Sequence, residues 1–233
     1  MKLPSRIYPL SEKALVVAWE QRIDPTIASC VRQLQQHLSH HPFTGLEEMV
    51  PAYASLTLFY DPFLIKEKTT QSVAAWVEQY LLQLLQTIED LPADTCARRI
   101  EIPVCYGGEY GPDLAAVAAH CGIPEAEVIR LHSSAVYQVY LLGFVPGFAY
   151  MGGLPASLAT PRKATPRQDV SAGSVGIAGM QTGIYPMKIT GGWQIIGRTP
   201  LDLFRIDRQP PALLQAGDEI SFIPVTDYIP ASQ

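Results

Sequence analysis

Cysteine and histidine are scarce in this chain, and neither occurs after residue 132. The four cysteines form no CxxC pair, and without a secretion signal we interpret them as small reduced hydrophobic residues. The glycine-rich part of the chain that follows residue 132 therefore contains no His/Cys ligand set for zinc and no local Ser-His pair. We expect no metal site in this chain.

Three nucleotide-binding and hydrolase motifs are also absent. No GxxxxGK[ST] string occurs, so a Walker-type loop in this chain does not hold ATP. The glycines of SAGSVGIAG are spaced by three and precede a strand pattern, which excludes a dinucleotide-binding GxGxxG turn. No GxSxG nucleophile elbow is present, so an α/β-hydrolase is excluded as well.

Basic charge and long hydrophobic runs are lacking. The net charge of −5 argues against nucleic acid as the main partner, because binding the phosphate backbone needs a basic face. The only apolar run near the N-terminus, Ala14 to Trp19, is short and flanked by charge, so we expect neither a signal peptide nor a membrane span. These features predict a cytoplasmic protein with no membrane partner.

The first ninety residues predict a small sheet covered by two helices. Ala14 to Trp19 has the pattern of a strand, and Asp24-Pro25 supplies the cap of an amphipathic helix that ends at Pro42. Two strands are expected within 46–60, followed by a longer helix capped by Thr70. We therefore predict an α+β sandwich as the N-terminal domain, residues 1–92.

The remaining residues, 93–233, predict a second and mainly β domain. A strand is expected over 99–106, followed by two short helices over 114–120 and 124–131. The helix pair resembles a helix-turn-helix in outline, but its second helix is acidic, which favours a structural connector over a DNA reader. From Val136 onward short strands alternate with Gly/Pro turns, as in a closed barrel or a sandwich.

Function is expected in the segment 143–200, which holds 11 of the 17 glycines. Arg162 and Arg167 each follow a proline, and Arg198 ends a strand pattern. Arginine suits carboxylate or phosphate, and glycine-rich turns can aim backbone N–H groups at an anion. These residues form either an anion site, or surface salt bridges and the tight turns of a barrel.

Aromatic and hydrogen-bonding residues accompany the arginines. Phe144 and Tyr150, with Phe148 between them, either wall a pocket for a small flat ring or plug the space beneath a loop. Gln181 and Tyr185 are neutral groups suited to an amide or carbonyl. His132 is the histidine nearest to this segment and the leading acid/base candidate, with a hydrogen-bonded helix-end histidine as the alternative.

Five strings of the sequence, in this order, resemble the family of allophanate hydrolase subunit 1, the kinase inhibitor KipI and the B-type subunit of 5-oxoprolinase. They are IPVCYGGEYGPDL (102–114), LLGFVPGFAYMGGLP (141–155), PRKATPR (161–167), AGSVGIAGMQTGIYP (172–186) and GGWQIIGRTPL (191–201). The resemblance extends over nearly the whole chain. It implies an N-terminal α/β domain followed by a cyclophilin-like β-barrel.

The resemblance also implies an activity. The most widespread role in the family is that of one subunit of an ATP-dependent 5-oxoprolinase, which works with subunits A and C and opens a lactam to glutamate. An unstrained lactam is a poor electrophile, so phosphorylation of its oxygen is a reasonable route. We expect the carboxylate and phosphate of such an intermediate to meet Arg162, Arg167 and Arg198. Backbone N–H groups near Gly173, Gly176 and Gly179 are expected to stabilise an oxyanion.

Two other roles within the family stay open at this stage. One is a regulator that inhibits a sensor histidine kinase, for which an exposed apolar patch is expected instead of an anion pocket. The other is a subunit of a urea- or allophanate-processing enzyme, in which partners would supply the biotin-carrying and ATP-grasp segments.

Overall fold

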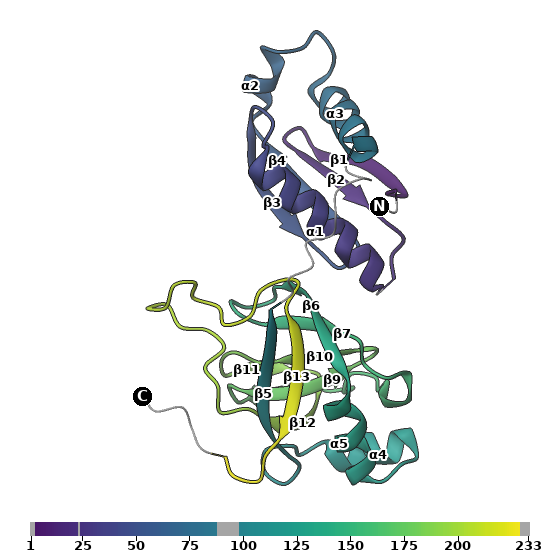
Figure 1. Cartoon of the computed structure of the whole chain (residues 1–233), viewed down its shortest axis with the longest axis vertical. Coiled ribbons are helices and arrows are strands. Elements are labelled where there is room, and N and C mark those ends of the chain that lie inside the picture. The colour runs from purple at the N-terminus through teal and green to yellow at the C-terminus, as the bar shows by residue number, and fades with distance from the viewer. Residues whose placement is uncertain (1–2, 23, 88–97, 229–233) are drawn as a thin grey trace. The chain divides into compact units, whose positions relative to one another are not determined.

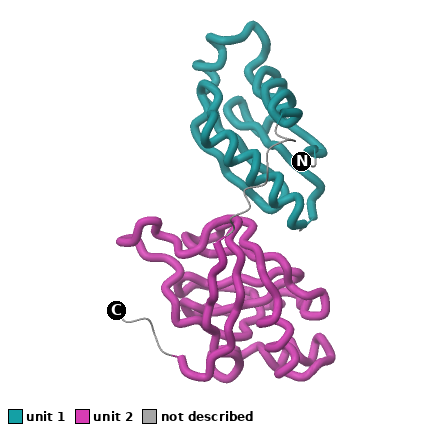
Figure 2. The backbone as a smooth tube through the Cα atoms, viewed as in Figure 1, with its two compact units in different colours: residues 1–96 teal, residues 97–233 magenta. Residues whose placement is uncertain are grey.

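The chain divides into two compact units, Met1–Cys96 and Ala97–Gln233 (Figure 2). The computed structural model describes residues 3–22, 24–87 and 98–228. The domain boundary expected after residue 92 lies outside the described residues. Each unit is therefore described by itself.

The N-terminal unit is a four-stranded antiparallel sheet in the order β1-β2-β4-β3, with helices packed on it (Figure 1). Its largest helices are α1, which packs on β3 and β4, and α3, which packs on β1 and β2. The described elements are β1 (Arg6–Ser11), β2 (Ala14–Ala18), α1 (Pro25–His40), β3 (Leu46–Pro51), β4 (Ser55–Tyr60), α2 (Pro62–Lys66) and α3 (Val73–Thr87). The predicted α+β architecture of this unit is confirmed.

Local capping explains where its helices begin. Asp24 caps α1 as predicted, since its carboxylate accepts a hydrogen bond from the Thr26 backbone at 2.8 Å. The predicted Thr70 cap of α3 is wrong, because Ser72 accepts the bond from the Ala75 backbone at 3.3 Å. Sequence reasoning missed α2, which begins with the same Asp-Pro signal at Asp61. It also missed β1, an exposed edge strand interrupted by a proline.

The second unit is a closed seven-stranded barrel in the order β10-β7-β6-β13-β5-β12-β9 (Figure 1). Strands β8 and β11 pair in a separate two-stranded sheet. Its parallel pair is β5 and β13, which brings the two ends of the unit together. The strands are β5 (Arg99–Tyr106), β6 (Val136–Leu142), β7 (Ala149–Gly152), β8 (Arg167–Val170), β9 (Ser174–Ala178), β10 (Gln181–Ile184), β11 (Ile189–Gly191), β12 (Gln194–Arg198) and β13 (Glu219–Pro224).

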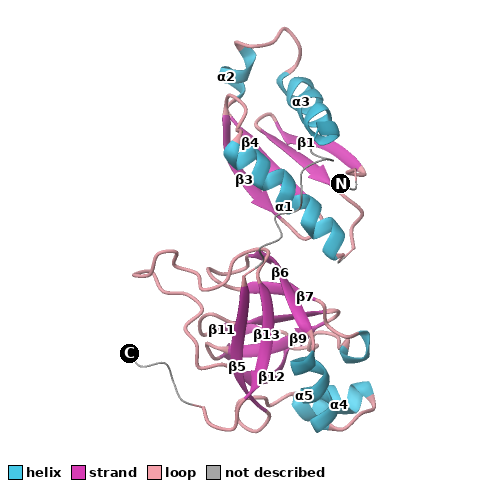
Figure 3. Cartoon of the chain, in the orientation of Figure 1, coloured by secondary structure: helices cyan, strands magenta, loops and turns pink. Residues whose placement is uncertain are grey.

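Helices α4 (Leu114–Cys121) and α5 (Glu125–Ser134) lie at one end of the barrel (Figure 3), and a short 3-10 turn, Ala156–Leu158, packs against both. The apolar residues of these helices join the side chains inside the barrel in one core. The predicted helix pair and the predicted barrel are therefore confirmed. The pair is built into the barrel core, as expected of a structural connector.

Candidate functional site

The candidate site is a pocket on the outer face of the barrel. It has a volume of about 210 Å³, and its lining residues come from four segments: Phe144, Phe148, Tyr150, Arg162, Pro166, Tyr185, Thr190, Gly191, Gly192 and Trp193. Five of these residues are aromatic, and we call four of them the aromatic box: Phe148, Tyr150, Tyr185 and Trp193. The pocket therefore combines an apolar box with one cationic side chain.

Edge-to-face packing holds the aromatic box together. The Phe148 ring lies 5.4 Å from the Trp193 ring and 5.1 Å from the Tyr185 ring, both nearly perpendicular to it. Tyr150 lies 4.7 Å from Phe148. Such pairs contribute about 0.5–1.5 kcal/mol each beyond the area that they bury. The walls of the pocket are therefore rigid before any ligand arrives.

A glycine in β10 provides the flat floor beneath these rings. A Cβ atom at Gly183 would lie 3.0 Å from both Phe148 Cζ and Trp193 Cζ3. Any side chain at this position would lift the rings from the strands. Part of the glycine enrichment in this segment is thus explained by close aromatic packing on the barrel.

Phe144 lines the pocket and has a strained backbone conformation. It is the one non-glycine residue with a positive φ, 70°, in the part of the chain that the structure describes, and its side chain is 61% exposed. A bulky residue in this left-handed region costs free energy, and such strain gathers at functional sites. Its ring lies 5.8 Å from that of Phe148, so it extends the aromatic wall outward.

Arg162 supplies the positive charge of the pocket. It is exposed, and neither a hydrogen bond nor an ion pair engages its guanidinium among the described residues. Burial raises the pKa of Tyr150 and of Tyr185, and the charge of Arg162 opposes this rise in both. An unpaired guanidinium beside an apolar box is suited to a flat ligand that carries a carboxylate.

The two tyrosines remain protonated at neutral pH. Burial raises the pKa of Tyr185, and the Trp193 backbone and Arg162 oppose it only in part. Burial also raises the pKa of Tyr150 above its usual value. Both hydroxyls can therefore donate a hydrogen bond to a carbonyl oxygen or accept one from an N–H group.

A buried carboxylate anchors the segment that carries Arg162. Asp113, 3% exposed, accepts hydrogen bonds from Lys163 Nζ at 2.7 Å and from Arg167 Nη2 on one oxygen, and from the Ile195 backbone at 2.8 Å on the other. Burial alone would raise the pKa of Asp113, but these donors together hold it below its usual value. Asp113 thus stays ionised at neutral pH.

The predicted site residues separate into two groups. Phe144, Tyr150, Arg162 and Tyr185 all line the one pocket. The other predicted residues do not line it and have different surroundings in the structure; they are His132, Arg167, Gly173, Gly176, Gly179, Gln181 and Arg198.

Arg167 and Arg198 serve the structure of the barrel unit. Arg167 is paired with Asp113. Arg198, at the end of β12 away from Trp193, donates to the Ala172 carbonyl at 2.7 Å and lies over the Tyr228 ring. The structure therefore does not bring the three arginines together as expected for a carboxylate and a phosphate, because only Arg162 lines the pocket.

The three glycines do not form the expected oxyanion hole. The Gly173 N–H donates to the Tyr185 carbonyl and the Gly179 N–H to the Thr160 carbonyl, each at 2.7 Å. Gly176 lies within β9, between β10 and β12. Gln181 begins β10 opposite Ala178 and does not reach the pocket lining. Backbone pairing within the barrel uses these positions.

His132 is a core residue of the barrel unit, which corrects the sequence-based prediction that it is the acid/base group. It is fully buried, with Nδ1 at 2.7 Å from the Tyr106 hydroxyl and Nε2 at 3.0 Å from the Thr182 hydroxyl. Burial lowers the pKa of His132 to about 3. The imidazole is therefore neutral, and it does not line the pocket. These surroundings agree with the alternative given above, a hydrogen-bonded histidine at the end of a helix.

This burial gives the stability of the barrel unit a pH dependence. Neutral His132 contributes its stability fully above pH 6.5 and loses it as the pH falls toward about 3, because the unfolded imidazole takes up a proton. Between pH 7 and pH 4 we expect the wild-type chain to lose about 3 kcal/mol more of unfolding free energy than His132→Asn does. Urea denaturation at several pH values measures this difference, and equal losses in both proteins would contradict it.

Sequence reasoning did not assign a site role to Asp113, Pro166, Thr190 or the Gly191-Gly192 pair. The sequence gives no signal for the role of Asp113, because an aspartate at the start of α4 predicts a helix cap and its carboxylate does not cap that helix. The GGW string directly before β12 could have identified the glycine pair and Trp193. Each of these residues acts through neighbours that are distant in the sequence.

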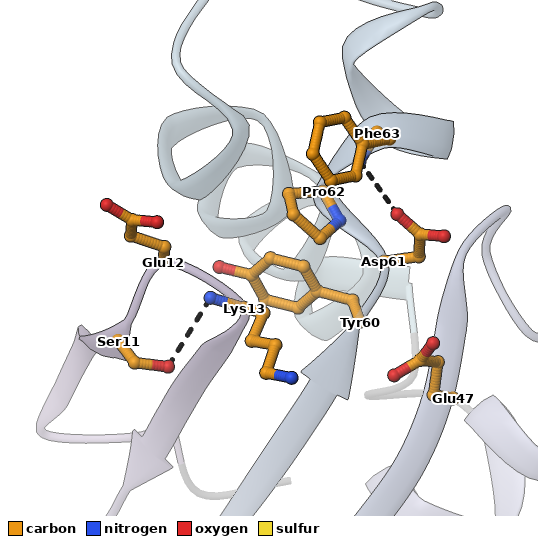
Figure 4. Close-up of a pocket in the computed structure, with 8 residues that line it drawn as sticks. All are labelled: Ser11, Glu12, Lys13, Glu47, Tyr60, Asp61, Pro62 and Phe63. Carbon is orange, nitrogen blue, oxygen red and sulfur yellow. Dashed lines mark hydrogen bonds between the residues drawn. The ribbon is translucent and has the colours of Figure 1, made fainter.

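A second pocket, of about 630 Å³, lies in the N-terminal unit (Figure 4). It is lined by Ser11, Glu12, Lys13, Glu47, Tyr60, Asp61, Pro62 and Phe63. Local turns use two of its polar groups: the Asp61 carboxylate accepts from the Phe63 backbone at 2.8 Å, and the Ser11 hydroxyl accepts from the Lys13 backbone. It lacks the aromatic box and the unpaired arginine of the barrel pocket, so we place the candidate site on the barrel.

Among the residues that the structure describes, no group of three His, Cys, Asp or Glu side chains could hold a metal ion. No helix in the described ranges is long and apolar enough to cross a membrane.

Comparison with known proteins shows the family to which this chain belongs. Residues 5–214 match the family model of the carboxyltransferase domain, subdomains C and D, and the chain belongs to this family. Within it, the chain is 40% identical over 229 residues to the B-type subunit of 5-oxoprolinase from Bacillus subtilis, covering 97% of this chain and 95% of that protein. It is 43% identical over 220 residues to the corresponding 5-oxoprolinase subunit of Escherichia coli O157:H7, covering 94% and 96%.

Two solved structures and a further relative are also similar to this chain. The crystal structure of TTHA0988 superposes with a TM-score of 0.76 at 35% identity, over 91% of this chain and 40% of that chain. PH0987 from Pyrococcus horikoshii is 40% identical with a TM-score of 0.54, over 94% and 97%. The urea amidolyase of Lachancea kluyveri is 27% identical over 91% of this chain, which corresponds to 13% of that enzyme.

Proposed function

We propose that this chain is the B-type subunit of an ATP-dependent 5-oxoprolinase complex and that its barrel pocket holds 5-oxoproline. Proteins named as this subunit of 5-oxoprolinase match it over nearly their full length, and such a name implies further subunits. We propose subunits of the A and C types as those partners. ATP is the co-substrate of the complex in this proposal.

The observation that carries the proposal is the unpaired Arg162 beside the aromatic box. 5-Oxoproline is a small, nearly flat lactam with one carboxylate. The rings of Phe148 and Trp193 offer apolar faces to the lactam ring, and Arg162 offers a planar fork to its carboxylate. The hydroxyls of Tyr150 and Tyr185 are available to the lactam carbonyl and N–H. A volume of about 210 Å³ suits a ligand of this size.

The chemistry of the complex follows from the low reactivity of an amide. Transfer of the γ-phosphoryl group of ATP to the lactam oxygen would make the carbonyl carbon electrophilic. The transfer releases ADP. One water then adds at this carbon and the ring C–N bond breaks, which leaves an acyl phosphate of glutamate. A second water hydrolyses this acyl phosphate to glutamate and phosphate. In this proposal the barrel pocket binds and orients the lactam, with tyrosine donors available to the oxygen that gains charge.

The test is an omission experiment on the reconstituted complex. The complex of this chain with its A- and C-type partners should form glutamate and ADP in equal amounts from 5-oxoproline and ATP. The partners alone should form neither, and adding back the chain should restore both. Full activity without this chain, or a complete complex that is inactive on 5-oxoproline, would overturn the proposal.

A further inference from the structure

Asp113 is an aspartate at the start of a helix whose side chain does not cap that helix. It occupies the N-cap position of α4, yet no backbone N–H of the helix donates to its carboxylate. An N-cap aspartate normally stabilises a helix by about 1 kcal/mol. Its carboxylate instead receives three donors from other segments, and we infer that this position is used for another purpose.

The carboxylate joins the two parts of the barrel pocket. One oxygen accepts from the Ile195 backbone, two residues after Trp193, and the Asp113 N–H donates in return to the Ile195 carbonyl at 2.8 Å. The other oxygen holds Lys163 and Arg167. One wall of the pocket and the segment that carries Arg162 are therefore tied to the same carboxylate.

Residues 161–167, which we call the strap, contain no helix or strand until β8 begins at Arg167. Two further hydrogen bonds hold the strap to the barrel. The Lys163 N–H donates to the Gly192 carbonyl at 2.8 Å, and the Gln194 side chain donates to the Pro161 carbonyl at 3.0 Å. Arg162 lies between these two anchors, and its own guanidinium has no partner among the described residues. Its direction is thus set by its neighbours.

We propose that Asp113 is a positioning residue, which fixes the strap so that Arg162 faces the aromatic box. This proposal depends on the proposed function in one respect, which is that 5-oxoproline is taken as the ligand of the pocket. Without the carboxylate, Lys163 and Arg167 lose their common partner and repel each other, and the strap is left with its backbone anchors. A guanidinium displaced by about 1 Å from a carboxylate ligand loses a large part of its effect.

Asp218 offers a matched control in the same unit. It is 4% exposed, accepts from Arg98 at 2.6 Å and 2.9 Å, and accepts from the Gln215 backbone at 2.7 Å. None of these residues lines the barrel pocket. Asp218→Asn therefore removes a comparably buried charge from a comparable set of donors without touching the strap.

The experiment compares Asp113→Asn with Asp218→Asn in the reconstituted complex and adds hydrogen exchange on the full-length chain. We expect both variants to lose thermal stability to a similar extent. Only Asp113→Asn should raise exchange of the Lys163 amide, and only Asp113→Asn should raise KM for 5-oxoproline, each by about tenfold or more. The KM effect should exceed the kcat effect, because the lost interaction orients the bound ligand.

Equal effects of the two variants on KM would show a merely structural role and overturn the proposal. An unchanged KM in Asp113→Asn would overturn it as well, whatever the exchange shows. If the wild-type complex does not turn over 5-oxoproline, the proposed function fails, and the exchange contrast still decides whether Asp113 holds the strap.

Discussion

Replacing Arg162 by alanine is expected to lower kcat/KM for 5-oxoproline by about 100-fold, since a charged hydrogen bond to a ligand carboxylate contributes roughly 1.5–3 kcal/mol. The thermal stability of the chain should stay unchanged. Arg162 is exposed and forms no ion pair within the described residues, so the folded state loses no interaction with it. Steady-state kinetics of the reconstituted complex, with calorimetry of the chain, measure both quantities.

Two variants make this result specific. Arg162→Lys keeps the charge but loses the planar fork, so we expect a smaller loss of kcat/KM than in Arg162→Ala. Arg198→Ala removes a guanidinium that is bonded to the Ala172 carbonyl outside the pocket, so it should reduce stability and leave KM close to the wild-type value. Wild-type kinetics in Arg162→Ala, or an equal loss in Arg198→Ala, would show that the pocket does not bind the substrate carboxylate.

Gly111→Ala is expected to destabilise the barrel unit by about 4 kcal/mol or more, an effect at the upper end for a single substitution. A Cβ atom at this position would overlap the Ile196 carbonyl oxygen and lie 2.5 Å from the Gly107 backbone nitrogen. Both are backbone atoms, which cannot rotate away as a side chain would. The turn before α4 would have to move, and Asp113 with it. Urea denaturation of the purified chain measures the loss.

Gly108→Ala is the matched control for this substitution in the same turn. A Cβ atom at Gly108 meets no atom within 4 Å, but the residue has a φ of 53°. The left-handed conformation alone should cost about 1 kcal/mol for alanine. Equal losses for the two variants would show that the close approach to β12 does not make glycine necessary at position 111.

Periodicity in the sequence was sufficient for much of the fold. The Asp24-Pro25 signal placed the start of α1, and the strand patterns from Val136 onward predicted the barrel. Strands as short as β8 or β11 were missed, because three or four residues give no usable alternation. The exposed edge strand β1 was missed because it carries no buried apolar face.

The sequence predicted the segment that contains the candidate site, but not which side chains of that segment contact one another. Glycine and aromatic density drew attention to the segment that contains Arg162 and Tyr185, and both line the pocket. The sequence could not separate Arg162 from Arg167, because the partner of Arg167 lies 54 residues away. The burial of His132 likewise depends on contacts between distant strands. Non-local contacts decided each of these assignments.

The most direct test of the central claim is fluorine NMR of the reconstituted complex in which only this chain carries 5-fluorotryptophan. The chain has three tryptophans, and of these only Trp193 lines the barrel pocket. Saturating 5-oxoproline should shift the Trp193 resonance alone, with a midpoint that follows KM and that moves to higher concentration in Arg162→Ala. An unchanged Trp193 resonance under conditions in which the complex forms glutamate would contradict the assignment of this pocket as the substrate site.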